Sequence, residues 1–169
     1  YIIKELAKDR SENTKIRTFA SVSNLIVLNT LLIFIVGIII YPIVLDLSPE
    51  FEIVKSLFAI LLMIKVISNF SSIPTSIQIS SQRMGFVNLI KIFLVPIEIL
   101  LVILFLNNDY GIFALAYGEL IISIIYLIII TISTKELFKL YRFKIYKSSF
   151  IESIKYSFSY YLVKLSQIG

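Results

Sequence analysis

The segment Thr18–Leu45, TFASVSNLIVLNTLLIFIVGIIIYPIVL, contains no ionisable side chain except that of Tyr41. A helix needs about 20 predominantly apolar residues to cross the hydrocarbon core of a bilayer, and this segment is longer than that. Its apolar residues run continuously, whereas strands of membrane β-barrels are about ten residues long and alternate in polarity. The segment therefore predicts a transmembrane helix that spans residues 18–45.

Three further segments share this character and predict three more spans. They are residues 56–79, 85–106 and 111–133. Hydrophobic residues make up 58% of the chain and charged residues 16%, whereas soluble domains average about 45–50% and about 25%. The composition excludes a soluble domain, and the predicted fold class is all-α: a polytopic transmembrane helical bundle.

Basic residues gather at alternate ends of the predicted spans. Residues 1–17, the loop that contains Arg83 and the connector 134–147 are basic, whereas the loops near residues 50 and 108 are acidic. Positively charged ends stay in the cytoplasm. We therefore expect 1–17 to be a cytoplasmic loop and 134–147 a basic cytoplasmic connector. Residues 148–169 form either an amphipathic segment or the start of a truncated further helix.

The chain contains neither cysteine nor histidine. Zinc sites, thiol catalysis and histidine-activated nucleophiles are thereby excluded, and we expect no cofactor, no metal site and no enzyme activity. The net charge of +5 is concentrated at helix ends, which indicates membrane orientation and not a nucleic-acid partner. Because the sequence begins at Tyr1 and ends inside an apolar stretch at Gly169, we expect a piece of a longer protein.

Three charged residues, Lys65, Glu98 and Glu119, lie deep inside the predicted spans. With a rise of 1.5 Å per helical residue, Lys65 lies about 15 Å from the outer end of its helix, and each glutamate about 12 Å. One positive and two negative groups thus share nearly the same layer. A charge at this depth is costly, so it usually faces a protein interior or a water-filled cavity.

Polar residues continue from these charges along the predicted helices. Residues three or four apart share a helix face, and Ser68, Asn69 and Ser72 follow Lys65 at such spacings, as Ser123 and Tyr126 follow Glu119 more weakly. We predict a hydrated cavity that opens toward the cytoplasm. Its candidate substrate or ion residues are Lys65, Glu98, Glu119, Lys91, Asn69 and Ser72. A second interpretation stays open, in which Lys65 pairs with Glu98 or Glu119 only to lock the bundle.

The segments SSIPTSIQ (71–78) and QRMGFVNLIKI (82–92) resemble the bacterial polysaccharide (O-antigen) flippases of the multidrug/oligosaccharidyl-lipid/polysaccharide exporter superfamily. The continuation through PIE (96–98) and YGIFALAYGE (110–119) is similar to the same family. The resemblance covers essentially the whole chain. It implies a two-lobe transporter of which this chain is part of the N-terminal lobe.

The resemblance also implies a substrate and a cellular location. The substrate would be an undecaprenyl-diphosphate-linked glycan, which the full-length protein, with its remaining helices, moves across the cell inner (cytoplasmic) membrane. Family members bind the anionic headgroup in a cationic cavity, for which Lys65 and Lys91 are the candidates. The chain departs from that pattern in its two carboxylates, so Glu98 and Glu119 are candidates for binding H⁺ or Na⁺ as a coupling ion.

Two other functions stay open at this point. One is export of a drug or of lipid II by a transporter of the same superfamily. The other is a membrane scaffold or assembly subunit that transports nothing, and it predicts no second helical lobe in the complete gene product. A transporter with alternating access needs two repeats that move around a site near the midplane, so we do not expect four spans alone to transport.

Overall fold

The computed structural model describes residues 12–46, 52–138 and 151, and it contains four long helices. They are α2 (Glu12–Asp46), α3 (Glu52–Ser80), α4 (Met84–Leu106) and α5 (Phe113–Phe138). Each of the four is long and apolar enough to cross a membrane. The part of the chain that is described contains no strand. The predicted fold class, a polytopic helical bundle, is confirmed.

The helices are longer than the spans predicted for them. Helix α2 begins at Glu12, inside the segment 1–17, and α5 continues to Phe138, inside the connector 134–147. Helical hydrogen bonding does not depend on lipid, so the helices continue past the apolar residues into charged sequence. The predictions for residues 1–11 and 139–169 lie outside the described residues, apart from the helical residue Ile151.

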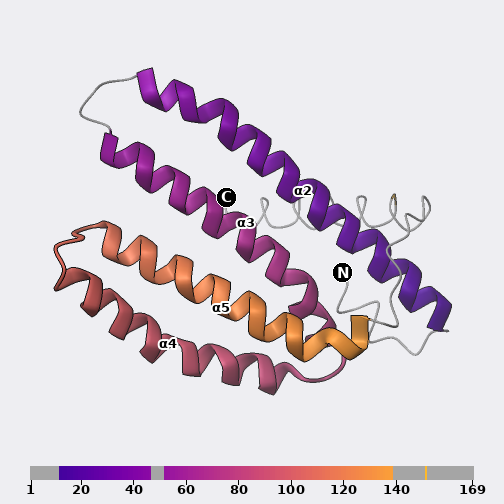
Figure 1. Ribbon diagram of the computed structural model, residues 1–169. Coiled ribbons are helices and arrows are strands. Elements are labelled where there is room, and N and C mark those ends of the chain that lie inside the picture. Colours follow the sequence, from indigo (N-terminus) through magenta and orange to yellow (C-terminus); the bar gives the residue numbers. More distant parts are fainter. Residues whose placement is uncertain (1–11, 47–51, 139–150, 152–169) are drawn as a thin grey trace, which may run out of the picture.

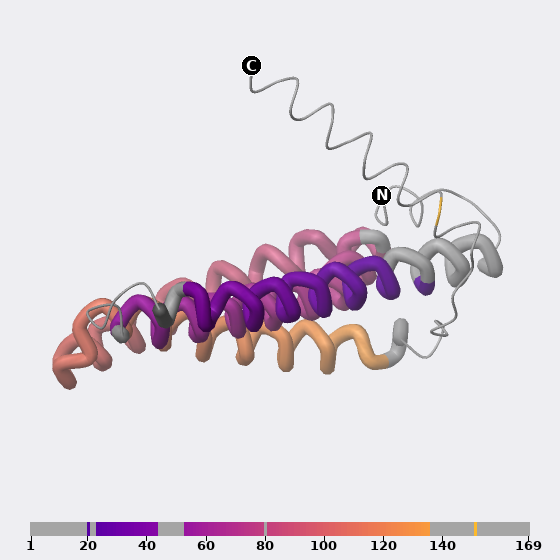
Figure 2. Tube along the Cα trace, turned by 90° about the horizontal axis from the view of Figure 1, so that it is seen from above, coloured from indigo at the N-terminus to yellow at the C-terminus, as the bar shows by residue number. Residues whose placement is uncertain are grey.

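The four helices run alongside one another (Figures 1 and 2), and in Figure 1 α5 lies between α3 and α4. Helix α3 packs on α5 and on α2, and α4 packs mainly on α5. Among the described helices, α2 contacts only α3. The gap between α3 and α4 is therefore bridged by α5, and this arrangement positions the site described below.

Two tight turns define the ends of the bundle. Residues 81–83 join α3 to α4, and Gln82 adopts a positive φ of 60° there. Residues 107–112 join α4 to α5, with positive φ at Asp109 and Gly111. We refer to these two ends as the 81–83 end and the 107–112 end. Phe105, Tyr110 and Tyr117 form a cluster of aromatic rings at the latter, as aromatic side chains often do at a membrane surface.

Close packing between helices depends on small residues. A Cβ atom at Gly37 of α2 would lie 2.5 Å from a methyl group of Leu62 in α3, and one at Gly118 of α5 would lie 2.8 Å from Val102 in α4. Small residues let helix backbones approach closely in membranes, where apolar burial adds little to helix association.

Large apolar side chains cover the outside of the bundle. Ile92 of α4 and Ile132 of α5 each retain 69% of their surface. A buried cluster of Val87, Ile90, Leu94 and Ile130 joins α4 to α5. Water would leave such an apolar exterior unfavourably solvated, whereas lipid chains solvate it well. The structure is that of a multi-pass membrane protein.

Candidate functional site

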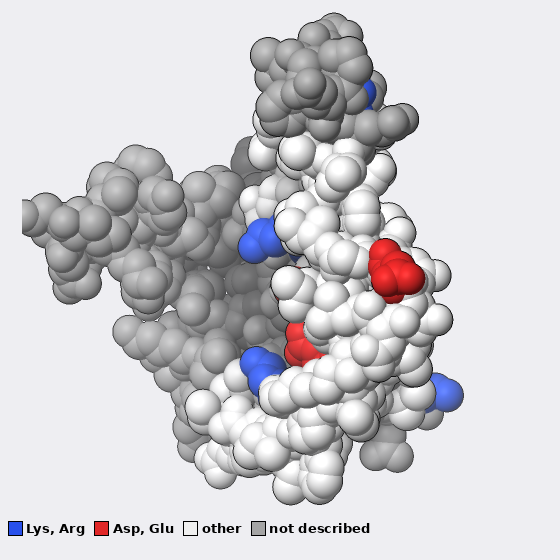
Figure 3. All heavy atoms as spheres, turned by 90° about the vertical axis from the view of Figure 1, so that its left-hand side faces the viewer, with Lys and Arg blue, Asp and Glu red and all other residues white. Residues whose placement is uncertain are grey.

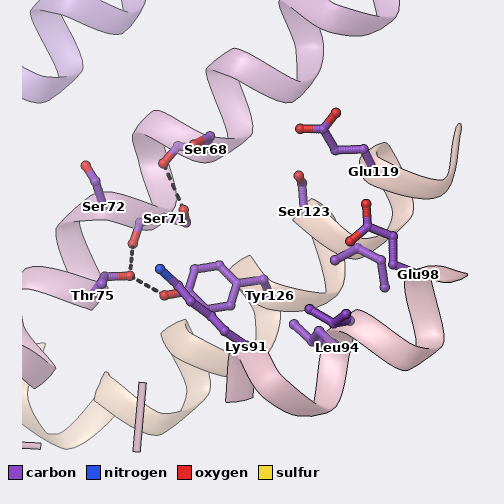
Figure 4. A pocket seen from close by; sticks show the side chains of 12 residues that line it. Ser68, Ser71, Ser72, Thr75, Lys91, Leu94, Glu98, Glu119, Ser123 and Tyr126 are labelled. Carbon is purple, nitrogen blue, oxygen red and sulfur yellow. Dashed lines mark hydrogen bonds between the residues drawn. The ribbon is translucent and has the colours of Figure 1, made fainter. Parts of the chain in front are cut away.

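A polar cleft opens between α3, α4 and α5, with a cavity volume of about 490 Å³ (Figure 4). Its walls combine three charged side chains with six hydroxyl groups and a few aliphatic side chains. The lining residues are Ser68, Ser71, Ser72, Thr75, Lys91, Leu94, Val95, Glu98, Glu119, Ile122, Ser123 and Tyr126. Such a concentration of polar groups within apolar helices marks the cleft as the candidate site.

The half of the cleft nearer the 107–112 end is acidic. Glu98 of α4 is half-buried and Glu119 of α5 is exposed, and both line the cleft. Figure 4 shows the two carboxylates on the same side, opposite Ser68 of α3. Neither forms an ion pair or hydrogen bond with another described residue. These two acceptor groups are therefore free to bind a ligand, an ion or water.

The other half of the cleft, nearer the 81–83 end, holds its lysine. The ammonium nitrogen of Lys91 lies 5.8 Å from the centroid of the Tyr126 ring, which is within the distance of a cation–π interaction. Because Lys91 is exposed, such a contact stabilises its charge by about 0.5–1 kcal/mol. Lys91 thus contributes a positive charge about two helical turns, or roughly 10 Å, from Glu98 on the same helix.

A hydrogen bond between Tyr126 and Thr75 joins α5 to α3 at this level. The two hydroxyl oxygens lie 2.8 Å apart. Thr75 donates its only hydroxyl hydrogen to the carbonyl oxygen of Ser71, at 2.7 Å. Tyr126 must therefore be the donor in the interhelical bond, and the Thr75 oxygen accepts it.

In the wall formed by α3, the hydroxyl groups of Ser71, Ser72 and Thr75 bond to their own helix. Ser71 donates to the carbonyl oxygen of Ser68 and Ser72 to that of Asn69, at 2.8 and 2.6 Å. Because a hydroxyl group has one hydrogen and two lone pairs, each of these groups offers the cleft only acceptor lone pairs. Bonds of this kind also surround Pro74, which cannot donate a backbone bond within the helix.

A buried amide side chain joins α3 to α5 between the cleft and the 81–83 end. The side chain of Gln78 in α3 is fully buried and donates to both the carbonyl oxygen and the hydroxyl oxygen of Ser133 in α5, at 3.0 and 3.2 Å. Interhelical bonds from amide side chains hold membrane helices together. Gln78 therefore holds α3 against α5 on the side of the cleft that is nearer the 81–83 end.

The structure brings four of the six predicted site residues together. Ser72, Lys91, Glu98 and Glu119 line the cleft, whereas Lys65 and Asn69 do not. Lys65 lies one turn beyond Ser68 toward the 107–112 end, and its side chain is exposed. Among the described residues, it pairs with neither Glu98 nor Glu119. The functional roles assigned to the six residues stay predictions.

The sequence pattern did not distinguish the polar residues of α3 that face the cleft from those that face away from it. Asn69 follows Ser68 directly, so it points about 100° away around the helix, and its amide nitrogen is buried without a hydrogen-bond partner. Ser71 and Thr75 line the cleft but were not among the predicted site residues. Their spacing from Ser68, at three and seven residues, is a signal that could have identified them.

The charged groups stand out on the surface. Figure 3, which views the bundle from its 107–112 end, shows acidic and basic side chains around a hollow, among residues that are otherwise uncharged. An apolar groove of about 570 Å³ lies between α2, α3 and α5, lined among others by Phe70, Pro74 and Ile128. It presents almost no polar group, so the chemistry of the bundle is concentrated in the polar cleft.

No family model, curated protein or solved structure shows a significant match to the chain.

Proposed function

We propose that this chain is part of a membrane transporter that moves a lipid-linked oligosaccharide across the cytoplasmic membrane, and that the polar cleft forms part of the substrate path. The observation that carries the proposal is the cleft itself: Lys91, Glu98 and Glu119 line one cavity within helices that are otherwise apolar. A bundle that served only as a membrane anchor would have no need of three charges at this depth, which are unfavourable in lipid.

The lack of ion pairs among the described charged residues favours transport over a purely structural role. A locking pair would bring a lysine into contact with a carboxylate, but Lys65, Lys91, Glu98 and Glu119 form no ion pair among the described residues. Unpaired charges in a membrane require water or a charged ligand. The cleft is also lined by hydroxyl groups, which suit the hydroxyl-rich surface of a glycan. The remaining helices of the full-length protein would complete the wall of the cavity and supply the second lobe.

The positive-inside assignment predicts which charged group a substrate from the cytoplasm meets first. If the 81–83 end faces the cytoplasm, Lys91 lies in the inner leaflet half and the two glutamates near the middle of the membrane. An anionic lipid headgroup that enters from the cytoplasm would then meet Lys91 first. The diphosphate of an undecaprenyl-linked glycan is such a group.

The test is transport by the full-length protein in liposomes that contain an undecaprenyl-diphosphate-linked oligosaccharide. The measured quantity is the rate at which the glycan becomes accessible to a lectin on the opposite side. Lys91→Ala and Glu98→Gln are expected to lower this rate at least tenfold, and Lys65→Ala to lower it less, because Lys65 lies outside the cleft.

A control and a contradicting result complete the test. Lys135→Ala removes an exposed lysine at the end of α5 and is expected to leave the rate unchanged. If the wild-type protein moves no lipid-linked glycan, or if both cleft variants transport at the wild-type rate, the proposed function is wrong. A scaffold subunit would give the first of these results.

A further inference from the structure

The charges that line the cleft do not sum to a cationic site. Lys91 contributes one formal positive charge, and Glu98 and Glu119 contribute two negative ones. Lys65 does not line the cavity and cannot balance the difference locally. A ligand that carried only phosphate groups would therefore enter a cavity in which the described side chains sum to a negative formal charge, and like charges repel one another.

Hydrogen-bond acceptors also outnumber donors along the walls of the cleft, and this preference does not depend on the net charge. The hydroxyl groups of Ser71, Ser72 and Thr75 donate to carbonyl oxygens of their own helix, so they offer the cleft only lone pairs. The two carboxylates are also acceptors when ionised. Among the described residues, Lys91 is the one cationic donor that lines the cleft. The α3 wall therefore offers mainly acceptors to a ligand with N–H and O–H donors, while the hydroxyl groups of Ser68 and Ser123, which bond to no other described residue, can donate as well as accept.

The positively and negatively charged groups lie at opposite ends of the cleft. Lys91 lies at the Tyr126 end of the cleft, while Glu98 and Glu119 lie together at the opposite end (Figure 4). Seven residues separate Lys91 from Glu98, as they separate Tyr126 from Glu119, which corresponds to roughly 10 Å along each helix. The cleft thus has an anion-binding end and a cation-binding end, with hydroxyl acceptors between them.

We infer that the cleft binds a ligand with a phosphate group at one end, an ammonium group at the other and hydroxyl groups between them, which is the chemistry of an amino-sugar phosphate. The phosphate pairs with Lys91, and the ammonium group lies between Glu98 and Glu119. This inference rests on the proposed function and specifies its substrate: the glycan that follows the lipid phosphate carries a free amine.

A zwitterionic phospholipid headgroup shares the phosphate and the amine but lacks the hydroxyl groups. The acceptor-only hydroxyls of Ser71, Ser72 and Thr75 favour the sugar, because phosphoethanolamine has no O–H group to donate to them. The two sources are separated by the probes used below.

The test is calorimetric titration of the full-length protein in detergent micelles with four soluble probes. They are glucosamine 6-phosphate, glucose 6-phosphate, glucosamine and O-phosphoethanolamine. Glucosamine 6-phosphate is expected to bind at least tenfold more tightly than each of the others, which corresponds to about 1.4 kcal/mol. Glucose 6-phosphate is the matched probe, because it differs only by a hydroxyl group in place of the amine.

Substitutions assign the two ends of the ligand. In a Glu98→Gln/Glu119→Gln variant, the preference for glucosamine 6-phosphate over glucose 6-phosphate is expected to vanish. In Lys91→Met, the preference for glucosamine 6-phosphate over glucosamine is expected to vanish. Lys135→Ala, outside the cleft, is expected to keep both preferences, and circular dichroism of each variant checks that it is folded.

Three results would overturn the inference. Equal affinity for glucose 6-phosphate would remove the role of the amine, equal affinity for O-phosphoethanolamine would assign the site to a lipid headgroup, and the absence of any binding would remove the site. Liposome transport separates these failures from failure of the proposed function. A protein that moves the lipid-linked glycan but shows no amine preference retains the function and loses only this inference.

Discussion

Substitution of Gly118 by alanine tests the contact between α4 and α5 beside the two carboxylates. The added Cβ would lie 2.8 Å from Cγ2 of Val102 and 3.9 Å from the carbonyl oxygen of Glu98. Carbon atoms in contact are normally about 3.5–4.0 Å apart, so one side must yield by roughly 1 Å. Valine in a helix has one strongly preferred rotamer and cannot easily turn away. Overpacking of this kind costs about 1–3 kcal/mol.

Gly85→Ala is the matched control, because a Cβ there meets no atom within 4 Å. Gly118→Ala, inside α5, gains up to about 1 kcal/mol of helix propensity, and Gly85→Ala, in the first turn of α4, gains less, so the difference between them is a lower bound on the steric term. We expect Gly118→Ala to be less stable than Gly85→Ala by about 1–3 kcal/mol. The free energy of unfolding is measured by titration with sodium dodecyl sulfate, followed by circular dichroism.

A second substitution shows whether the contact with Val102 causes the loss of stability in Gly118→Ala. Val102→Ala removes the methyl group that the new Cβ meets, so Gly118→Ala is expected to cost less in that background, with a coupling energy of about 1 kcal/mol or more. If Gly118→Ala is as stable as Gly85→Ala, and Val102→Ala shows no coupling to it, the packing of α4 on α5 described here is wrong.

Three further predictions concern single contacts and the orientation of the bundle. Tyr126→Phe is expected to cost about 0.6 kcal/mol, the average for an interhelical hydrogen bond in a membrane protein; in a double-mutant cycle with Thr75→Val, a coupling energy of zero would show that the bond does not form. Gln78→Glu is expected to cost at least about 3 kcal/mol, because it leaves a buried, unpaired charge, while Gln78→Leu costs less; equal stability of the two variants would contradict the burial of this side chain. Ser81→Cys is expected to react with an impermeant thiol reagent only from the cytoplasmic side and Asn108→Cys only from the outer side, and the reverse pattern would overturn the topology.

The hydropathy of the sequence predicted the four helices, because a bilayer contains no water that could stabilise a non-helical backbone. Unsatisfied backbone groups are so unfavourable in lipid that a continuous apolar segment must form a helix. The ends of the helices were less predictable: α5 continues through Lys135 to Phe138, since helical hydrogen bonds do not require apolar side chains. The tight turn at 107–112 depends on the positive φ of Asp109 and Gly111, and Asp109-Tyr-Gly111 carries only a general turn signal.

For the candidate site, the direction in which each side chain points was not predictable from the sequence. A rise of 1.5 Å per residue predicted that Lys65, Glu98 and Glu119 share a layer. Which side of each helix meets its neighbour depends on how the helices rotate and pack, and a single helix sequence does not determine this. Lys65, which was predicted at the depth of the glutamates, therefore lies outside the cleft, while Lys91, two turns from Glu98, lines it.

The most direct test of the account is whether water fills the polar cleft. The chain has no cysteine, so single cysteines can be introduced at two adjacent positions of equal depth on α5. Ser123 lines the cleft, whereas Ile124 is exposed on the apolar surface. Maleimides react with the thiolate, which forms in water and is disfavoured in lipid.

The measured quantity is the rate of reaction of each variant with a charged maleimide in the full-length protein in lipid nanodiscs. If the cleft is a hydrated path, Ser123→Cys reacts at least tenfold faster than Ile124→Cys. Equal rates, or a faster reaction at Ile124→Cys, would contradict a water-filled cleft and, with it, the proposed path for a polar substrate.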